Sequence, residues 1–176
     1  MKALVGLGNP GKEYDTTWHN AGFQFIDFCA EKFQIGFSNK FRSLFAETRL
    51  DSGQKLILLK PQNYMNNSGS AVLELKKFYK LDSNDICICF DDLDLPVDTF
   101  KIQHKKYPKA HNGVNDIIAR TATDEYTFVR IGIENRSPVE REFLRGREYV
   151  LQKSRHDFIL LFRTILLELL GTFDEM

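Results

Sequence analysis

The sequence predicts an α/β domain built on a twisted, mixed β-sheet flanked by helices. Short apolar runs alternate along the chain with segments that place apolar residues at helical spacing. Two of these runs are joined by a tight polar turn, which adds an antiparallel hairpin to an otherwise parallel arrangement. No repeat or flexible linker divides the 176 residues. We therefore expect residues 1–176 to form a single domain.

The first elements follow from local patterns. KALVGLG, residues 2–8, is apolar throughout and ends in glycine, which is typical of a buried strand. NAGFQFIDFCAEKF, residues 20–33, has a largely helical rhythm of apolar residues. SLFAETRL (43–50) and KLILLK (55–60) flank the turn residues Asp51-Ser52-Gly53, so they predict a hairpin.

The later elements continue the alternation. SGSAVLELKKFYKL, residues 68–81, predicts a helix, with Asn67 or Ser68 as its N-cap. The remaining predicted elements are strands over 85–92 and 99–103, a helix over 112–122, a strand over 128–134 and helical structure after about residue 147.

Composition limits the partners and the compartment. Lysine plus arginine equals aspartate plus glutamate, so an RNA or membrane partner would require a local basic patch. Cys29, Cys87 and Cys89 cannot form a disulfide framework, and we expect a reducing, cytoplasmic protein with these thiols in its core. The most apolar stretch, residues 158–170, is too short to span a bilayer and predicts a docked helix rather than membrane association.

Gly6, Gly8 and Gly11 follow the first strand with the spacing of the dinucleotide-binding motif GxGxxG. In that motif the third glycine opens a helix whose N-terminus holds the pyrophosphate. Here Gly11 precedes the polar stretch KEYDTTWHN, and no acidic residue ends a second strand at the required distance. A dinucleotide-dependent enzyme therefore remains an alternative that requires a helix beginning at Gly11.

Polar side chains follow several predicted strands, at the edge where α/β sheets build their sites. A histidine in this set could take a proton from water if a strand-end carboxylate held its other ring nitrogen. No serine or cysteine occupies a nucleophile position, and the GxSxG motif is absent. The residues thus suggest water activated directly by a His–Asp pair. The set comprises Asn9, His19, Asn20, Tyr64, Asn66, Asn67, Asp91, Asp92, Asp94, His111 and Asn112.

Metal binding is a competing use of the same residue types. The aspartates of DDLDLP, residues 91–96, could bind a divalent cation. Leucines separate them, however, and the spacings HxH and HxxxH are absent from the chain. We therefore expect no metal site.

Four ordered blocks resemble the bacterial-type peptidyl-tRNA hydrolase family: VGLGNPGKEYDTTWHNAGF, LLKPQNYMNNSGSAV, FDDLDLP and HNGVNDII, with REYVLQKS as a weaker fifth. Together they span nearly the whole chain. The resemblance implies a phosphorylase/hydrolase-like α/β fold. It also implies cofactor-free hydrolysis of the ester between a peptide and the 3′ ribose of tRNA, which releases the tRNA for reuse.

The resemblance also implies residue roles. His19 matches the general base, Asp91 the carboxylate that orients it, and Asn9 the residue that reads the blocked α-nitrogen of the peptide. One positioned general base contributes about 10²–10⁴-fold, which suits an activated ester. Tyrosines can stack on unpaired bases of the acceptor end. The positions matched to substrate contacts are Tyr14, Tyr64, Asn66 and Asn112, the last also holding the water.

The chain departs from the family in the loop HKKYPKAHNG, where lysines replace glycines. Such a run is usually solvated, but beside an RNA site lysines can contact phosphates. The tRNA is the expected partner, with no obligate protein partner and a monomeric state. The candidate phosphate contacts are Lys101, Lys105, Lys106, Lys109 and Arg130.

Two further features leave alternatives open. Trp18 stands where the family usually has arginine, and it either packs against the first helix or stacks on substrate. Residues 140–149 form either a solvated helix face or a mobile flap over the cleft. A catalytically inactive RNA-binding module would keep the tyrosines and lysines but would not need the His–Asp pair, so the pair favours an enzyme.

Overall fold

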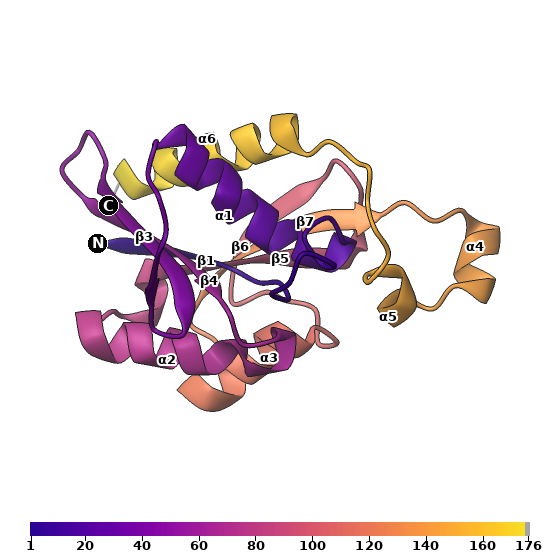
Figure 1. The fold of residues 1–176 in the computed structure, drawn as a ribbon, viewed down its shortest axis with the longest axis horizontal. Helices are drawn as coiled ribbons and strands as arrows, with labels where there is room; N and C mark the ends of the chain where they lie inside the picture. The colour runs from indigo at the N-terminus through magenta and orange to yellow at the C-terminus, as the bar shows by residue number, and fades with distance from the viewer. Residues whose placement is uncertain (175–176) are drawn as a thin grey trace.

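The computed structural model describes residues 1–174 and contains one open seven-stranded sheet (Figure 1). The strand order is β2-β3-β4-β1-β5-β7-β6. The four inner strands are parallel, whereas β2, β3 and β6 pair antiparallel with their neighbours. This confirms the predicted mixed α/β sheet. The strands are β1 (Lys2–Gly6), β2 (Ser38–Lys40), β3 (Ser43–Arg49), β4 (Lys55–Pro61), β5 (Ile86–Pro96), β6 (Phe100–His104) and β7 (Thr127–Glu134).

Helices cover both faces of the sheet (Figure 1). α1 (Ala21–Lys32) and α6 (Ile159–Asp174) lie on one face, and α2 (Ser68–Tyr79) and α3 (Asn112–Thr121) lie on the other. Two short helices, α4 (Pro138–Phe143) and α5 (Gly146–Tyr149), follow β7, and α4 projects from the body of the protein. Three single 3₁₀ turns complete the set: η1 (Trp18–Asn20), η2 (Met65–Asn67) and η3 (Ser83–Asp85).

The glycines after β1 serve close packing. A Cβ on Gly6 would lie 2.3 Å from the carbonyl oxygen of Gly22 in α1, so only glycine lets strand and helix approach this closely. Gly11 has a φ of 119° and lies in a turn, and the next α-helix begins only at Ala21. The helix that a dinucleotide site requires at Gly11 is therefore missing, and that alternative is excluded.

Most predicted elements are confirmed, including the hairpin of β3 and β4 around Asp51-Ser52-Gly53. The prediction of helical structure after about residue 147 is wrong in part, because residues 150–158 form turns and irregular chain between α5 and α6. The Asn67 side chain does not cap α2; its Oδ1 instead accepts a hydrogen bond from Arg120 at 2.9 Å.

β2 was not predicted, and α4 was predicted only in part, because a helix face was offered for residues 140–149 but not for the helix start at Pro138. β2 is only three residues long and carries no clear apolar alternation. α4 has a sequence signal that went unused: Ser137 and Glu140 form a capping box around Pro138 in the first helical turn.

The expectations about the core hold. Cys29, Cys87 and Cys89 are buried free thiols. Burial raises the pKa of the Cys87 thiol to about 12, so it is inert at neutral pH. Within residues 1–174, no helix combines the length and the apolar character needed to cross a bilayer.

Candidate active site

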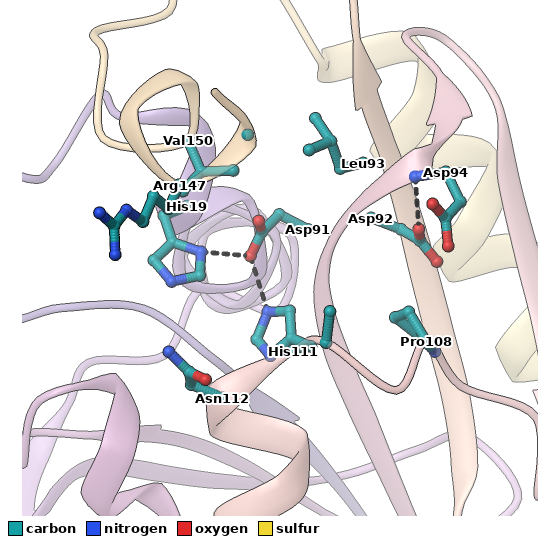
Figure 2. Close-up of a pocket in the computed structure, with 12 residues that line it drawn as sticks. His19, Asp91, Asp92, Leu93, Asp94, Pro108, His111, Asn112, Arg147 and Val150 are labelled. Atoms are coloured by element: carbon teal, nitrogen blue, oxygen red, sulfur yellow. Dashed lines mark hydrogen bonds and ion pairs between the residues drawn. The ribbon is translucent and has the colours of Figure 1, made fainter. Parts of the chain in front are cut away.

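The candidate site is a cavity of about 320 Å³ at the carboxyl end of β5 (Figure 2). Asp91 comes from β5, His19 from η1 before α1, and His111 and Asn112 from the start of α3. The far wall is formed by α5, which contributes Arg147. Residues from four separate parts of the chain thus meet at the sheet edge where α/β proteins build their sites.

His19 and Asp91 form the predicted pair. His19 Nδ1 lies 2.8 Å from Asp91 Oδ1, and the aspartate is 3% exposed. A carboxylate accepts hydrogen bonds, so Nδ1 carries the proton and Nε2 keeps its lone pair. Figure 2 shows Nε2 pointing away from Asp91, toward the open part of the cavity. The lone pair is therefore placed to receive a proton.

His111 binds the same carboxylate oxygen. Its Nε2 lies 3.0 Å from Asp91 Oδ1, and its Nδ1 accepts the backbone N–H of Val114 at 3.3 Å. Because Nδ1 accepts this bond, Nε2 carries the proton that His111 donates to Asp91. Asp91 thus receives two N–H donors on one oxygen.

The charges of the pair stabilise each other. Burial alone would raise the pKa of Asp91, but His19 and then His111 outweigh it and hold that pKa well below its usual range. Burial alone would lower the pKa of His19, but the Asp91 carboxylate outweighs it and raises that pKa above 6.5. Asp91 is therefore an anion at neutral pH, and His19 is a stronger base than an isolated imidazole.

The backbone around His19 is held by the C-terminal loop, defined as residues 149–154. His19 N donates to the Val150 carbonyl at 2.8 Å, and Trp18 N donates to the Gln152 carbonyl at 3.2 Å. The Trp18 ring is 7% exposed and stacks on Tyr149 with ring centroids 5.4 Å apart. Trp18 is therefore buried against the C-terminal loop. Its ring packs inside the protein and does not stack on substrate.

Asn20, which follows His19 in the chain, holds the backbone of Asn9. Asn20 Oδ1 accepts the Asn9 N–H at 2.9 Å, and Asn20 Nδ2 donates to the Asn9 carbonyl at 2.9 Å. The Asn9 side chain then accepts the Met65 N–H through Oδ1 at 2.9 Å. A backbone N–H requires an oxygen partner, so the Asn9 NH₂ group is the end left for a ligand.

Met65 connects this wall of the site to α3. A Cβ on Gly113 would lie 2.6 Å from Met65 Sδ, so a glycine is needed for this contact. Asn66 follows Met65 and Asn112 precedes Gly113, and both side chains are exposed. Asn112 lines the cavity with His19, whereas Asn9 and Asn66 do not line it and connect to that wall through Met65.

The two predicted tyrosines lie in loops of the same region. Tyr64 immediately precedes η2 and is 58% exposed, which leaves its ring available for stacking. Tyr14 is half-buried in the loop between β1 and η1.

The five candidate phosphate contacts differ in how they are engaged. Arg130 Nε lies 2.5 Å from Asp92 Oδ2, and Arg130 also donates to Gln103, so its charge is already used inside the protein. Lys105 pairs with Glu125, and Lys109 lies 4.3 Å over the Tyr107 ring. Within the described chain, Lys101 and Lys106 have neither an ion pair nor a side-chain hydrogen bond. These two keep a full charge for a ligand.

His19, Asp91 and His111 are also the one group in the described residues that could hold a metal ion, with a ligand atom from each within 4.8 Å of the others. Asp91 Oδ1 already accepts both imidazole N–H groups at hydrogen-bond distance. A metal would have to replace both of these protons, whereas the observed donor–acceptor pattern is complete without one.

Sequence reasoning missed the roles of His111 and Asn20. Both were recognised as polar residues at strand ends, but only the fold shows that His111 reaches the Asp91 carboxylate and that Asn20 holds the Asn9 backbone. The one feature of the sequence that pointed to these roles is the repeated His-Asn pair at 19–20 and 111–112, which places a base beside an amide.

A buried carboxylate that holds a histidine with an open Nε2 is the arrangement that hydrolases use when a general base activates water. Comparison with known protein families identifies which kind of hydrolase this is. The profile of the peptidyl-tRNA hydrolase family matches residues 3–168, so the chain belongs to that family.

Individual relatives agree. The peptidyl-tRNA hydrolase of Brevibacillus brevis is 45% identical over 139 residues, which cover 78% of this chain and 73% of that protein. The enzyme of Pediococcus pentosaceus is 41% identical over 160 residues, covering 90% and 83% of the two chains. The crystal structure of peptidyl-tRNA hydrolase from Acinetobacter baumannii superposes with a TM-score of 0.78 at 34% identity, covering 88% and 76%.

Proposed function

We propose that this peptidyl-tRNA hydrolase cleaves the ester between the peptide and the 3′ ribose of tRNA by general-base catalysis through His19. The observation that carries the mechanism is the geometry of His19: Nδ1 is fixed on the buried Asp91 carboxylate, and Nε2 opens into the cavity. A histidine with this tautomer and a raised pKa is suited to remove a proton from water.

The reaction follows from this arrangement. Nε2 takes a proton from a water molecule while the water oxygen bonds to the ester carbonyl carbon, which gives a tetrahedral oxyanion. The oxyanion then collapses and breaks the bond to the ribose 3′ oxygen. The leaving oxygen takes the proton back from the His19 imidazolium, so the enzyme returns to its starting state. Asp91 stabilises the imidazolium formed between these two steps.

Asn112 and Asn9 are positioned for the substrate. Asn112 lies next to the His19 ring in the cavity wall (Figure 2), where its amide can hold the attacking water or donate to the oxyanion. Asn9 Oδ1 is engaged by Met65, so its NH₂ group would donate to a peptide carbonyl. The second lone pair of Oδ1 can still accept the N–H of a blocked α-amine. A free α-ammonium would have to lose its water at this site, which disfavours aminoacyl-tRNA.

His111 supports the pair from the other side. By donating to Asp91, it fixes the carboxylate that orients His19. Its own Nδ1 is tied to the first turn of α3, so the three side chains form one connected unit.

The exposed lysines and tyrosines support binding of the tRNA acceptor end. Tyr64 offers a ring for a base, and Lys101 and Lys106 offer charges for phosphates. Three buried thiols agree with action in the cytoplasm, and the site is complete within one chain, which agrees with a monomer.

The test is release of an N-acetylated amino acid from tRNA by the wild type and by His19→Ala. We expect a loss of about 10²–10⁴-fold in kcat for the variant. His104→Ala is the matched control, because His104 is an exposed histidine outside the cavity. No release by the wild type, or equal rates for His19→Ala, would disprove the proposal.

A further inference from the structure

Arg147 occupies the cavity wall opposite Asn112 without an assigned role. It is the only lysine or arginine among the residues that line the cavity. Figure 2 shows its side chain beside the His19 ring, with the guanidinium pointing away from Asp91. A permanent positive charge therefore stands next to the reacting position.

The backbone that carries Arg147 is fixed relative to His19. Gly146 packs so closely on β5 that a Cβ there would lie 2.5 Å from Leu93 Cδ2. Two positions after Arg147, the Tyr149 hydroxyl donates to the Ile133 carbonyl at 2.7 Å. His19 N then bonds to the Val150 carbonyl. Position 147 is thus held at a defined place on the rim of the site.

The Arg147 side chain has no partner inside the protein. Within residues 1–174 it makes neither an ion pair nor a side-chain hydrogen bond, and it is exposed. The two buried carboxylates nearby are already engaged, Asp91 by two histidines and Asp92 by Arg130. The guanidinium is therefore available to an anion from outside the chain.

We propose that Arg147 binds the phosphodiester that precedes the terminal nucleoside of the tRNA. This proposal rests on the proposed function, because the anion belongs to that substrate. A guanidinium offers paired N–H donors that match phosphate oxygens, and every peptidyl-tRNA carries this phosphate next to the ester. The developing oxyanion is a poorer match, since its stabilisation requires donors held in place beforehand, and nothing holds this guanidinium.

The experiment compares two substrates with the same acyl group: N-acetyl-aminoacyl-tRNA, and N-acetyl-aminoacyl-adenosine, which has the ester but no phosphate. We expect Arg147→Gln to lower kcat/KM for the tRNA roughly tenfold, mainly through KM. The rate with the adenosine ester should stay the same. Arg145→Gln is the matched control, because Arg145 is exposed on the same segment and does not line the cavity.

A binding measurement gives a second readout that needs no turnover. For an RNA hairpin with a 3′ CCA end, the slope of log Kd against log salt should fall by about 0.7 in Arg147→Gln, as expected for one lost phosphate contact on a single strand. Arg145→Gln should keep the wild-type slope.

The outcomes separate the possible roles. Equal losses on both substrates would assign Arg147 to the oxyanion and overturn the proposal. An equal loss in Arg145→Gln, or no loss in Arg147→Gln, would overturn it as well. If the wild type cleaves neither substrate, the proposed function fails, while the hairpin measurement still decides whether Arg147 contacts phosphate.

Discussion

The inside and the rim of the active site are built in different ways. Inside, the groups that orient the site already have their partners: Asp91 accepts from two histidines, and Asn20 holds both backbone groups of Asn9. On the rim, Arg147 and Lys106 are exposed and unpaired within the described chain. In the proposed function, the groups that perform chemistry are fixed before substrate arrives, whereas the charges that bind RNA obtain their partners only from the RNA.

This difference predicts two kinds of variant. Changes inside the site should act on kcat and on the pH profile, because they disturb a preorganised unit. Changes on the rim should act on KM and on the salt dependence, because they remove contacts with phosphates.

The largest effect in this comparison is expected for Asp91→Asn. The amide cannot stabilise the His19 imidazolium, and it can favour the wrong tautomer, so kcat should fall by about 10²-fold or more. Asp94→Asn is the control, since Asp94 lines the same cavity but is exposed. A comparable loss in Asp94→Asn would show that overall charge, rather than the hydrogen bond to His19, is what matters.

The same variant should move the pH profile. His19 acts as a base only when neutral, so the wild-type rate falls as the pH falls through its pKa, which lies above 6.5 because of Asp91. In Asp91→Asn no carboxylate stabilises the charged form of His19, while the burial of His19 remains. The pKa of His19 should therefore fall, and the acid limb of kcat/KM should move to lower pH. An unmoved limb would mean that another group controls it.

His111→Gln is expected to have a smaller effect. The substitution removes one of the two donors to Asp91 but leaves the bond to His19, so kcat should fall roughly tenfold. The acid limb should shift as well, which a purely structural role would not cause. Unchanged kcat and pH profile would show that His19 and Asp91 work as an independent pair.

Lys106→Gln should have the smallest measurable effect. It should raise KM for tRNA a few-fold at low salt and change little at high salt. Lys105→Gln is the matched comparison, since Lys105 is paired with Glu125 and should matter less. A larger increase in KM for Lys105→Gln than for Lys106→Gln would mean that Lys105, rather than Lys106, contacts phosphate.

Chelation should have no effect. The hydrogen bonds among His19, Asp91 and His111 satisfy these groups without a metal, so activity should survive dialysis against EDTA. Loss of activity that returns with a divalent cation would make these three residues a metal site.

The sequence predicted the central sheet because buried strands and helices have different apolar periods, and the hairpin because its turn residues are specific. Position at strand ends and helix starts placed His19 and Asp91 among the candidate residues, and the resemblance to the peptidyl-tRNA hydrolase family singled them out. The environment of Trp18 could not be predicted, because its stacking partners lie more than a hundred residues away: Tyr149 at the end of α5 and His156 in irregular chain. The partners of Arg130 and His111 likewise depend on long-range packing.

The stacking of Trp18 has a practical consequence. It is the only tryptophan in the chain, and it directly precedes His19. Its indole packs against Tyr149, His156 and Phe158, so the tryptophan fluorescence of the protein comes from this cluster. Selective excitation of tryptophan can therefore follow, in real time and without a label, whether the C-terminal loop stays docked against the catalytic histidine.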